Sequence, residues 1–383
     1  MPHYRRVGSV PPKRHTDHRS PEGERYAEEL MGRRGFSGES SLLYHRHSPS
    51  AVHAIREADG APVTSSLETP LRPHHLRPAT LPTPSADPVR GRQMLLRNAD
   101  VRIGWVCADT DSPLTRSVVG DELVYVQSGS ATLASVFGTI TVGSGDYVVV
   151  PSGVNHQWTD VVDLRALVIE TSGAVSVPDR YLSAGGQFLE HAPYCERDLR
   201  GPAEFDARDE TDVDVLVRSV GGATWHTHAH HPFDVVGWDG CVYPWVLNIA
   251  DFEPVVGSIH QPPPVHQTFA ADGLVVCSFV PRPFDFHPDA IKVPYHHANV
   301  DSDEVLFYSD GDFMSRRGSG VEKESISFHP AGFVHGPQPG SVEASLGASR
   351  TEETAVMIDT FRPLEMTDAA RSVSDPDYPA SWG

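Results

Sequence analysis

The second half of the chain carries side chains that could together hold a metal ion. A histidine pair, His296-His297, lies upstream of Glu304, and His335 follows that glutamate 31 residues later. Two imidazoles and one carboxylate can bind a divalent transition metal on one face and leave neighbouring coordination positions open. Any one of these residues alone could be an ordinary core histidine or surface glutamate, but their combination favours a metal site.

The same spacing occurs a second time, earlier in the chain. In each half a glutamate is followed by a glycine and then by a Pro-x-Gly-x-x-His segment: Glu122, Gly129 and 151–156 in the first half, Glu304, Gly311 and 330–335 in the second. This spacing resembles the two cupin motifs, in which the Glu and His side chains converge inside a small β-barrel. The segment directly before Glu122, residues 116–121, contains no histidine at the place where the second half has one. We therefore expect His156 to be structural and the metal to lie in the C-terminal half.

Short β-rich segments must position these residues. The chain contains 33 prolines and 32 glycines, which separate runs of β-branched and aromatic residues, as in all-β sandwiches and barrels. Long helical periodicity is absent, which excludes a doubly wound α/β fold. The expected strands cover residues 122–127, 131–137, 139–142, 147–150, 165–170, 243–249, 274–280, 304–308, 324–328 and 355–360. The sequence thus predicts an all-β bicupin, with two cupin-like barrel or jelly-roll halves.

Residues 1–100 differ from the rest, because they are rich in Pro, His, Arg and Ser and show little periodicity. We expect an ordered but irregular N-terminal arm with one short helix at 25–31 and structural roles for His45 and His47. Residues 1–245 are expected to form the arm and a metal-free cupin-like domain. Residues 246–383 are expected to form the C-terminal catalytic cupin domain.

Composition excludes several classes of partner. The 383 residues include 31 Lys plus Arg and 51 Asp plus Glu, a net charge of −20 that would repel nucleic acid. No apolar run of about 18 residues could span a membrane, and the N-terminus lacks the apolar segment of a secretory signal, so we expect a cytoplasmic protein. The four cysteines are widely spaced, which argues against a disulfide framework or a structural zinc site.

Longer strings of residues point to a family. The chain resembles the bacterial homogentisate 1,2-dioxygenases over nearly its whole length. The strings that carry the resemblance are residues 13–16, 26–32, 35–38, 41–47, 231–240, 299–304 and 335–340. Members of this family use Fe(II) and dioxygen to open the ring of homogentisate, a hydroquinone with an acetate arm, giving maleylacetoacetate. The resemblance also implies a homo-oligomer, because relatives form trimers or hexamers.

The resemblance assigns roles to single residues. The iron ligands of the family correspond here to His297, Glu304 and His335, and two further active-site histidines correspond to His260 and His329. Prolines follow both of these histidines within two residues, so we expect each to lie in a rigid loop at the wall of the site. His260 is the candidate base, with His329 as an alternative or a partner. A loop histidine exposed to water is the competing interpretation for each.

Three positions depart from the family pattern or bear on the substrate. The chain has Tyr295-His296-His297 where the family usually has Tyr-Tyr-His, and Phe313 where a family tyrosine is expected to hydrogen-bond the substrate. Arg316 could pair with a substrate carboxylate or be a solvated loop arginine. We expect Tyr295, His296, Phe313 and Arg316 to contact the substrate. Losing one such hydrogen bond costs about 1 kcal/mol, which would weaken activity on homogentisate without abolishing it.

The expected function is therefore Fe(II)-dependent ring cleavage of homogentisate or a closely related hydroquinone or phenol by O2. One alternative is an iron dioxygenase that acts on a different phenolic compound in a biosynthetic pathway. Another is a non-oxidative metal-dependent cupin, either an isomerase or a binding protein. The ligand types alone do not separate iron from manganese or zinc.

Overall fold

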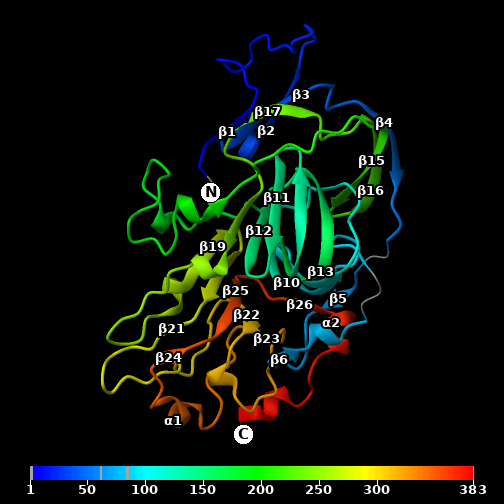
Figure 1. Cartoon of the computed structure of the whole chain (residues 1–383). Coiled ribbons are helices and arrows are strands. Elements are labelled where there is room, and N and C mark those ends of the chain that lie inside the picture. The colour runs from blue at the N-terminus through cyan, green and yellow to red at the C-terminus, as the bar shows by residue number, and fades with distance from the viewer. Residues whose placement is uncertain (1–2, 61–62, 83–85, 383) are drawn as a thin grey trace.

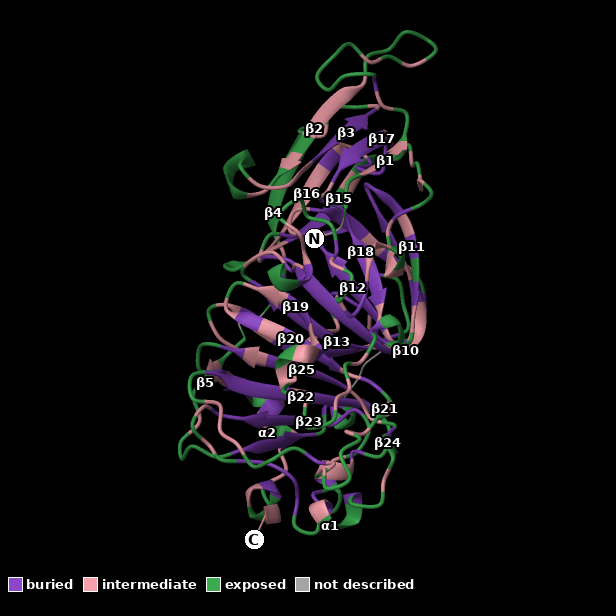
Figure 2. Cartoon of the chain, turned by 90° about the vertical axis from the view of Figure 1, so that its left-hand side faces the viewer, coloured by how far each residue is buried: buried purple, intermediate pink, exposed green. Residues whose placement is uncertain are grey.

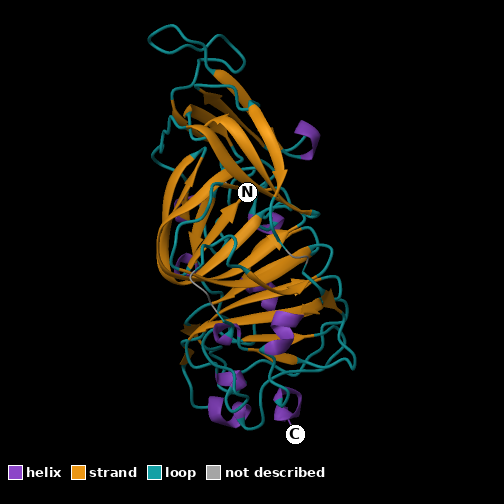
Figure 3. Cartoon of the chain, turned by 90° about the vertical axis from the view of Figure 1, so that its right-hand side faces the viewer, coloured by secondary structure: helices purple, strands orange, loops and turns teal. Residues whose placement is uncertain are grey.

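The structure, a computed structural model, describes residues 3–60, 63–82 and 86–382 and consists almost wholly of strands and loops (Figures 1 and 3). Over these residues the strands form sheets of 14, 6, 4 and 2 strands. The two α-helices, α1 (Ser341–Ser345) and α2 (Asp368–Ser372), have five residues each. The predicted all-β bicupin is confirmed. No helix of the described residues is long and apolar enough to cross a membrane.

The first half is built around long antiparallel strands. These are β8 (Val101–Ala108), β10 (Glu122–Ser135), β12 (Asp146–Val150) and β13 (Asn155–Thr171). The expected strands at 122–127 and 131–137 merge into β10, which bends where its register with β13 shifts between Val126 and Thr132. Gly129 lies in this bend with φ +78°, and a Cβ there would sit 2.4 Å from the carbonyl oxygen of Val162. The curl of the sheet therefore requires glycine at this position.

The second half is a six-stranded sheet in the order β19-β20-β25-β22-β23-β6. Its strands are β19 (Gln267–Ala271), β20 (Leu274–Phe279), β25 (Thr354–Thr360), β22 (Asp303–Asp310), β23 (Ile326–His329) and β6 (His74–Leu76). All strands expected here from residue 274 onward are present, although β23 begins two residues late because Glu324 has a φ of +67°. The edge strand β6 comes from the N-terminal arm.

The described residues of the arm are ordered, and its first part forms a four-stranded sheet together with β17. The order is β1 (Arg5–Gly8), β17 (Val235–Gly240), β3 (Ser40–His45) and β2 (Ala27–Gly32). The helix expected at 25–31 is wrong, because these residues pair with β3 and the tertiary ladder overrides their helix propensity. His45 lies between Asp234 and Glu29, at 2.6 and 3.0 Å. Burial opposes its charge, but hydrogen bonds to the two carboxylates raise the pKa of His45 to about 9.

The remaining strands are short or lie at the edges of the sheets. They are β4 (Val52–Glu57), β5 (Ser65–Ser66), β7 (Gln93–Arg97), β9 (Thr115–Ser117), β11 (Gly138–Gly143), β14 (Leu199–Arg200), β15 (Thr211–Ser219), β16 (Gly222–His230), β18 (Trp245–Asn248), β21 (Arg282–Pro283), β24 (Arg350–Thr351) and β26 (Glu365–Thr367). Strand β18 pairs with β12 in the large sheet. The domain boundary at 245 stays a prediction.

The two halves share one buried core (Figure 2). The Tyr125 hydroxyl lies 2.7 Å from Ser309 Oγ, and Tyr147 lies 2.8 Å from Ser278 Oγ. The rings of Trp105 and the Phe307 of β22 pack with centroids 5.6 Å apart. Because polar groups on each side are satisfied by the other half, the halves are held in a fixed relation.

The interior of the first half holds an ion network around the glutamate that corresponds to Glu304. Glu122 accepts hydrogen bonds from Arg92 (2.8 Å) and Arg218 (3.0 Å), and the same arginines contact Glu170. Burial opposes ionisation, but Arg92 and Arg218 hold the pKa of Glu122 well below its usual range. His156 is fully buried, and its Nδ1 donates to a backbone carbonyl two residues before it. Two guanidinium groups thus supply the positive charge that a metal would supply.

We expect Arg92→Met to lower the free energy of unfolding by about 3–5 kcal/mol, since it removes one of the two guanidinium groups that neutralise the buried carboxylates of Glu122 and Glu170. Urea denaturation followed by tryptophan fluorescence measures the loss. Arg350→Met is the matched control, because Arg350 pairs with Glu352 at the surface and exposed pairs contribute about 0–1 kcal/mol. Equal effects of the two substitutions would contradict a structural role for the network.

Candidate metal centre

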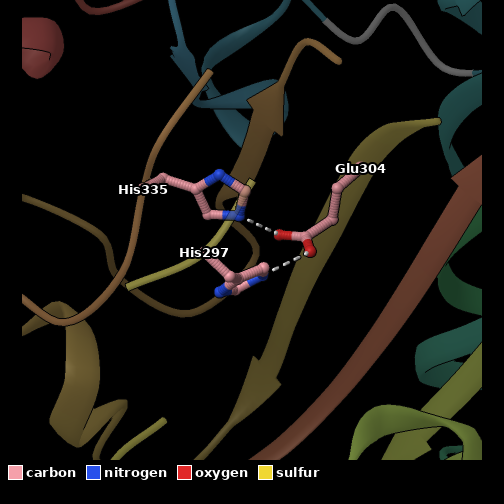
Figure 4. A group of neighbouring side chains, drawn as sticks. All are labelled: His297, Glu304 and His335. Atoms are coloured by element: carbon pink, nitrogen blue, oxygen red, sulfur yellow. Dashed lines mark ion pairs between the residues drawn. The ribbon is translucent and has the colours of Figure 1, made fainter. Parts of the chain in front are cut away.

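Three side chains of the second half converge on one point (Figure 4). The donor atoms of His297, Glu304 and His335 all lie within 4.8 Å of one another. Within the ranges that the structure describes, this is the one group of three or more His, Cys, Asp or Glu side chains close enough to hold a metal ion. Glu304 and His335 are buried, and His297 is half-buried.

Backbone pairing puts the three side chains on the same side. His297 and His335 face each other in a single antiparallel bridge, with the N–H of each donating to the carbonyl of the other at 2.8 and 2.9 Å. Glu304 lies near the start of β22, opposite His329 of β23 and Asp359 of β25. Residues that are directly opposite in a ladder project to the same face, so one bridge aims both imidazoles at one carboxylate.

The hydrogen bonds of the rings fix which nitrogen faces the centre. Nδ1 of His297 donates to the carbonyl of Tyr295 (3.1 Å), and Nδ1 of His335 donates to that of Phe333 (3.0 Å). The Nε2 atoms therefore carry lone pairs, and they face Glu304 oxygens at 3.6 and 3.2 Å. Ligand histidines usually show this arrangement, with the outer N–H held by a carbonyl.

A nitrogen lone pair and a carboxylate oxygen that face each other repel unless a cation lies between them. Nε2 of His335 is buried and has no hydrogen-bond partner among the described residues, which is costly for an isolated polar atom. Burial opposes the charge of Glu304, and the hydrogen bond from Nδ1 of His329 favours it, so its pKa is held below the usual range. The donor set therefore fits a divalent transition metal bound through two imidazoles and one carboxylate.

His329 lies directly behind the carboxylate of Glu304. It ends strand β23 and is fully buried, so the expectation that it lies in a loop is wrong. Strand pairing holds it against Glu304. Its Nδ1 donates to Glu304 Oε1 at 3.0 Å, and its Nε2 accepts from the hydroxyl of Tyr378 at 3.2 Å. Burial lowers the pKa of His329 to about 3, which agrees with a neutral ring that uses both nitrogens.

A cavity of about 370 Å³ opens beside the three ligands. This volume suits a ligand with a single aromatic ring and a short arm. His297 and Glu304 form part of its wall, together with apolar residues and charged residues that include Leu306, Met357 and Arg316.

Three of the other predicted site residues line this cavity. His260 has its ring 5.1 Å from that of Tyr295, which is 60% exposed at the rim. His260 lies in a loop, as expected, and is exposed, and partial burial lowers its pKa. Arg316 is buried, not solvated: its Nε donates to the hydroxyl of Tyr308 (2.9 Å) and its Nη1 to the carbonyl of Gly336 (2.7 Å).

Two predicted substrate contacts lie elsewhere. His296 is exposed and packs closely over Gly336. Phe313 is buried with a φ of +39°, and its ring packs edge-on against Tyr308 at 5.0 Å. Neither is among the residues that line the cavity. The residues directly after Phe313, which are Met314, Ser315 and Arg316, do line it.

Sequence reasoning missed several residues of the site. Asp359 lies opposite Glu304, and burial together with the charge of Glu304 raises its pKa to about 7. The side chain of Asn299 donates to it at 3.2 Å. Tyr378 reaches His329 from the C-terminal end of the chain, and Arg282 lines the cavity. No spacing in the sequence points to them, because strand register and chain path bring them to the site.

Comparison with known proteins gives a consistent relationship. Residues 4–249 match the family model of the homogentisate 1,2-dioxygenase N-terminal region. A provisionally named dioxygenase of Saccharolobus solfataricus is 38% identical, covering 100% of this chain and 99% of its own. The homogentisate 1,2-dioxygenase of Rhodopseudomonas palustris is 28% identical, covering 98% and 90%. A cupin 2 conserved barrel domain protein from Leptotrichia buccalis superposes with a TM-score of 0.37 at 11% identity, over 79% of this chain and 100% of its own. The chain therefore belongs to the homogentisate 1,2-dioxygenase family.

Proposed function

We propose that the protein is an Fe(II)-dependent ring-cleaving dioxygenase that acts on homogentisate or a related single-ring hydroquinone or phenol. The observation that carries this proposal is the placement of His297, Glu304 and His335, whose donor atoms meet at the wall of a ring-sized cavity. Membership of a dioxygenase family supports it. A bound iron would lower the pKa of a coordinated ring hydroxyl and provide open positions for substrate and O2.

The residues around the ligands would prepare the substrate. His260 is neutral, lines the cavity and would take the proton of the ring hydroxyl. Tyr295, which is 60% exposed, would shape the entrance, whereas His296 lies outside the cavity. Apolar side chains such as Leu306 and Met357 would contact the ring and exclude water.

His329 and Phe313 would act indirectly. Both nitrogens of His329 are engaged, so we propose that it positions Glu304 and does not accept the substrate proton. Phe313 packs on Tyr308 and would support the loop that carries Met314 and Arg316. Because it offers no hydroxyl to the substrate, a phenol other than homogentisate is the second candidate substrate.

Oxygen uptake tests the proposal. The Fe(II)-reconstituted protein is supplied with homogentisate and a panel of hydroquinones and phenols, and the product mass is followed. Uptake with a gain of two oxygen atoms by any of these substrates supports a ring-cleaving dioxygenase and identifies the substrate. If no member of the panel supports uptake, the non-oxidative alternatives, an isomerase or a binding protein, replace this proposal.

Glu304→Gln should lose most of the bound iron, since it removes the only anionic ligand of the three. Iron per chain, measured by metal analysis after reconstitution and desalting, should fall severalfold, and oxygen uptake with it. Glu343→Gln is the control, because Glu343 is exposed on α1, and it should keep its iron. A Glu304→Gln protein that is iron-replete and fully active would refute the ligand assignment.

A pH profile tests His260. Because its pKa is lowered, its base form persists below the ordinary histidine range, and kcat/KM should fall only at pH values below that range. His260→Gln should lower kcat/KM by about a hundredfold or more and remove this acidic limb, with iron content unchanged. His191→Gln is the control, since that histidine is exposed and lies outside the cavity. An unchanged limb in His260→Gln would assign the proton transfer to another group.

A further inference from the structure

Arg282 and Glu353 are two of several charged residues of the cavity wall that form no ion pair among the described residues. Arg282 and Glu353 both line the cavity and are half-buried. Over the described ranges, neither has an oppositely charged group within 4.0 Å, although 30 other ion pairs occur in the same residues. These two opposite charges therefore line the same cavity but do not form an ion pair with each other.

A two-stranded ribbon holds both residues on one wall. β21 pairs with β24 so that Arg282 lies opposite Thr351, and the backbone N–H of Glu353 donates to Thr351 Oγ1 at 3.1 Å. The turn that follows β22 packs against residues 352–353. Gly311 has a φ of +106°, and a Cβ there would lie 2.4 Å from the carbonyl oxygen of Glu352. Glycine is therefore required for the turn to approach the ribbon so closely.

The guanidinium of Arg282 has one edge free. Its Nη1 donates to the carbonyl of Val280 at 3.1 Å, and neither Nε nor Nη2 has a hydrogen-bond acceptor within the part of the chain that the structure describes. These two nitrogens form the fork that binds both oxygens of a carboxylate. Arg316 differs, because its Nε and Nη1 are both occupied within the protein. Arg282 is thus the better carboxylate receptor of the two.

Arg282 and Glu353 are both half-buried without an oppositely charged group close by among the described residues, and a bound ligand could supply the missing charges. Burial lowers the pKa of Arg282 and raises that of Glu353, as expected for charges without a close partner. Unpaired half-buried charges destabilise a fold. A ligand that carries an anion and a cation a few atoms apart would compensate both, whereas a simple acid would compensate only Arg282.

We propose that the cavity binds an aromatic substrate whose side arm is a zwitterionic α-amino acid, with its carboxylate on Arg282 and its ammonium group on Glu353. The ring would then lie toward His297 and Glu304. This assignment rests on the proposed function for the ring chemistry, but the recognition of the arm depends only on Arg282 and Glu353.

Binding to protein loaded with Zn(II), which does not activate O2, tests the arm without turnover. The two ligands are 2,5-dihydroxyphenylalanine and 3-(2,5-dihydroxyphenyl)propanoate, which differ only in the α-ammonium group. Titration calorimetry should show the amino acid binding about tenfold or more tightly, as expected for a charge-assisted hydrogen bond. Glu353→Gln should remove this preference and leave propanoate affinity nearly unchanged, and Arg282→Gln should weaken both ligands by a similar factor.

Glu352→Gln is the matched control, because Glu352 is exposed, pairs with Arg350 and does not line the cavity. It should keep the full preference for the amino acid. Equal affinity of the two ligands in the wild-type protein would overturn the proposal. So would a preference that survives Glu353→Gln, or one that is lost in Asp285→Asn instead, since Asp285 is the other carboxylate near Arg282 at this wall.

Failure of this inference is distinguishable from failure of the proposed function. Oxygen uptake with other phenols, but no preference for the amino acid, would overturn the arm assignment and retain the dioxygenase. If the amino acid is preferred through Glu353 but no substrate supports oxygen uptake, the arm assignment stands and the dioxygenase proposal falls.

Discussion

The buried carboxylate of Glu304 is the constraint on which the second half of the structure depends. Three imidazoles surround it: His297 and His335 turn lone pairs toward it, and His329 donates a hydrogen bond to it. Strand β23 places His329, and the bridge between two loops places the other two. Without a cation at the centre, the repulsion between these lone pairs and the carboxylate would destabilise the arrangement. The sheet, the loops and the cavity are therefore organised by one negative charge.

The first half shows how the same geometry is satisfied differently. Glu122 occupies the position equivalent to Glu304, yet Arg92 and Arg218 reach it where the second half has imidazoles. Guanidinium groups carry a permanent charge and fill the barrel, so this half gains rigidity and leaves no coordination position. One β architecture thus holds an ion network in one half and a candidate metal centre in the other. The difference lies in a few side chains that approach the glutamate.

The sequence was informative where spacing maps directly onto structure. The repeated Glu–Gly–His pattern pointed to Glu304 and His335, the histidine pair upstream and the resemblance pointed to His297, and the structure brings the three side chains together. Runs of β-branched and aromatic residues between glycines and prolines predicted strands in both halves. It was misleading at 25–31, where good helix formers are held in β2 by pairing with β3. It could not reveal Arg282, Glu353, Asp359 or Tyr378, because these residues reach the cavity through cross-strand register and the path of the C-terminal segment. Local patterns predict elements, whereas contacts between distant segments complete the site.

The arm strand β6 has a consequence for how this chain can be divided. Residues 74–76 form the edge of the sheet that carries Glu304, next to β23, and β5 of the arm pairs with β26 near the C-terminus. A fragment that begins after the first half would lose this edge strand and expose the backbone of β23. During synthesis, the edge strand β6 is made long before β22, β23 and β25, so the six-stranded sheet can form only when the C-terminal half has been made. The two halves therefore depend on each other structurally. A chimera that takes its C-terminal half from a relative would also need the arm of that relative.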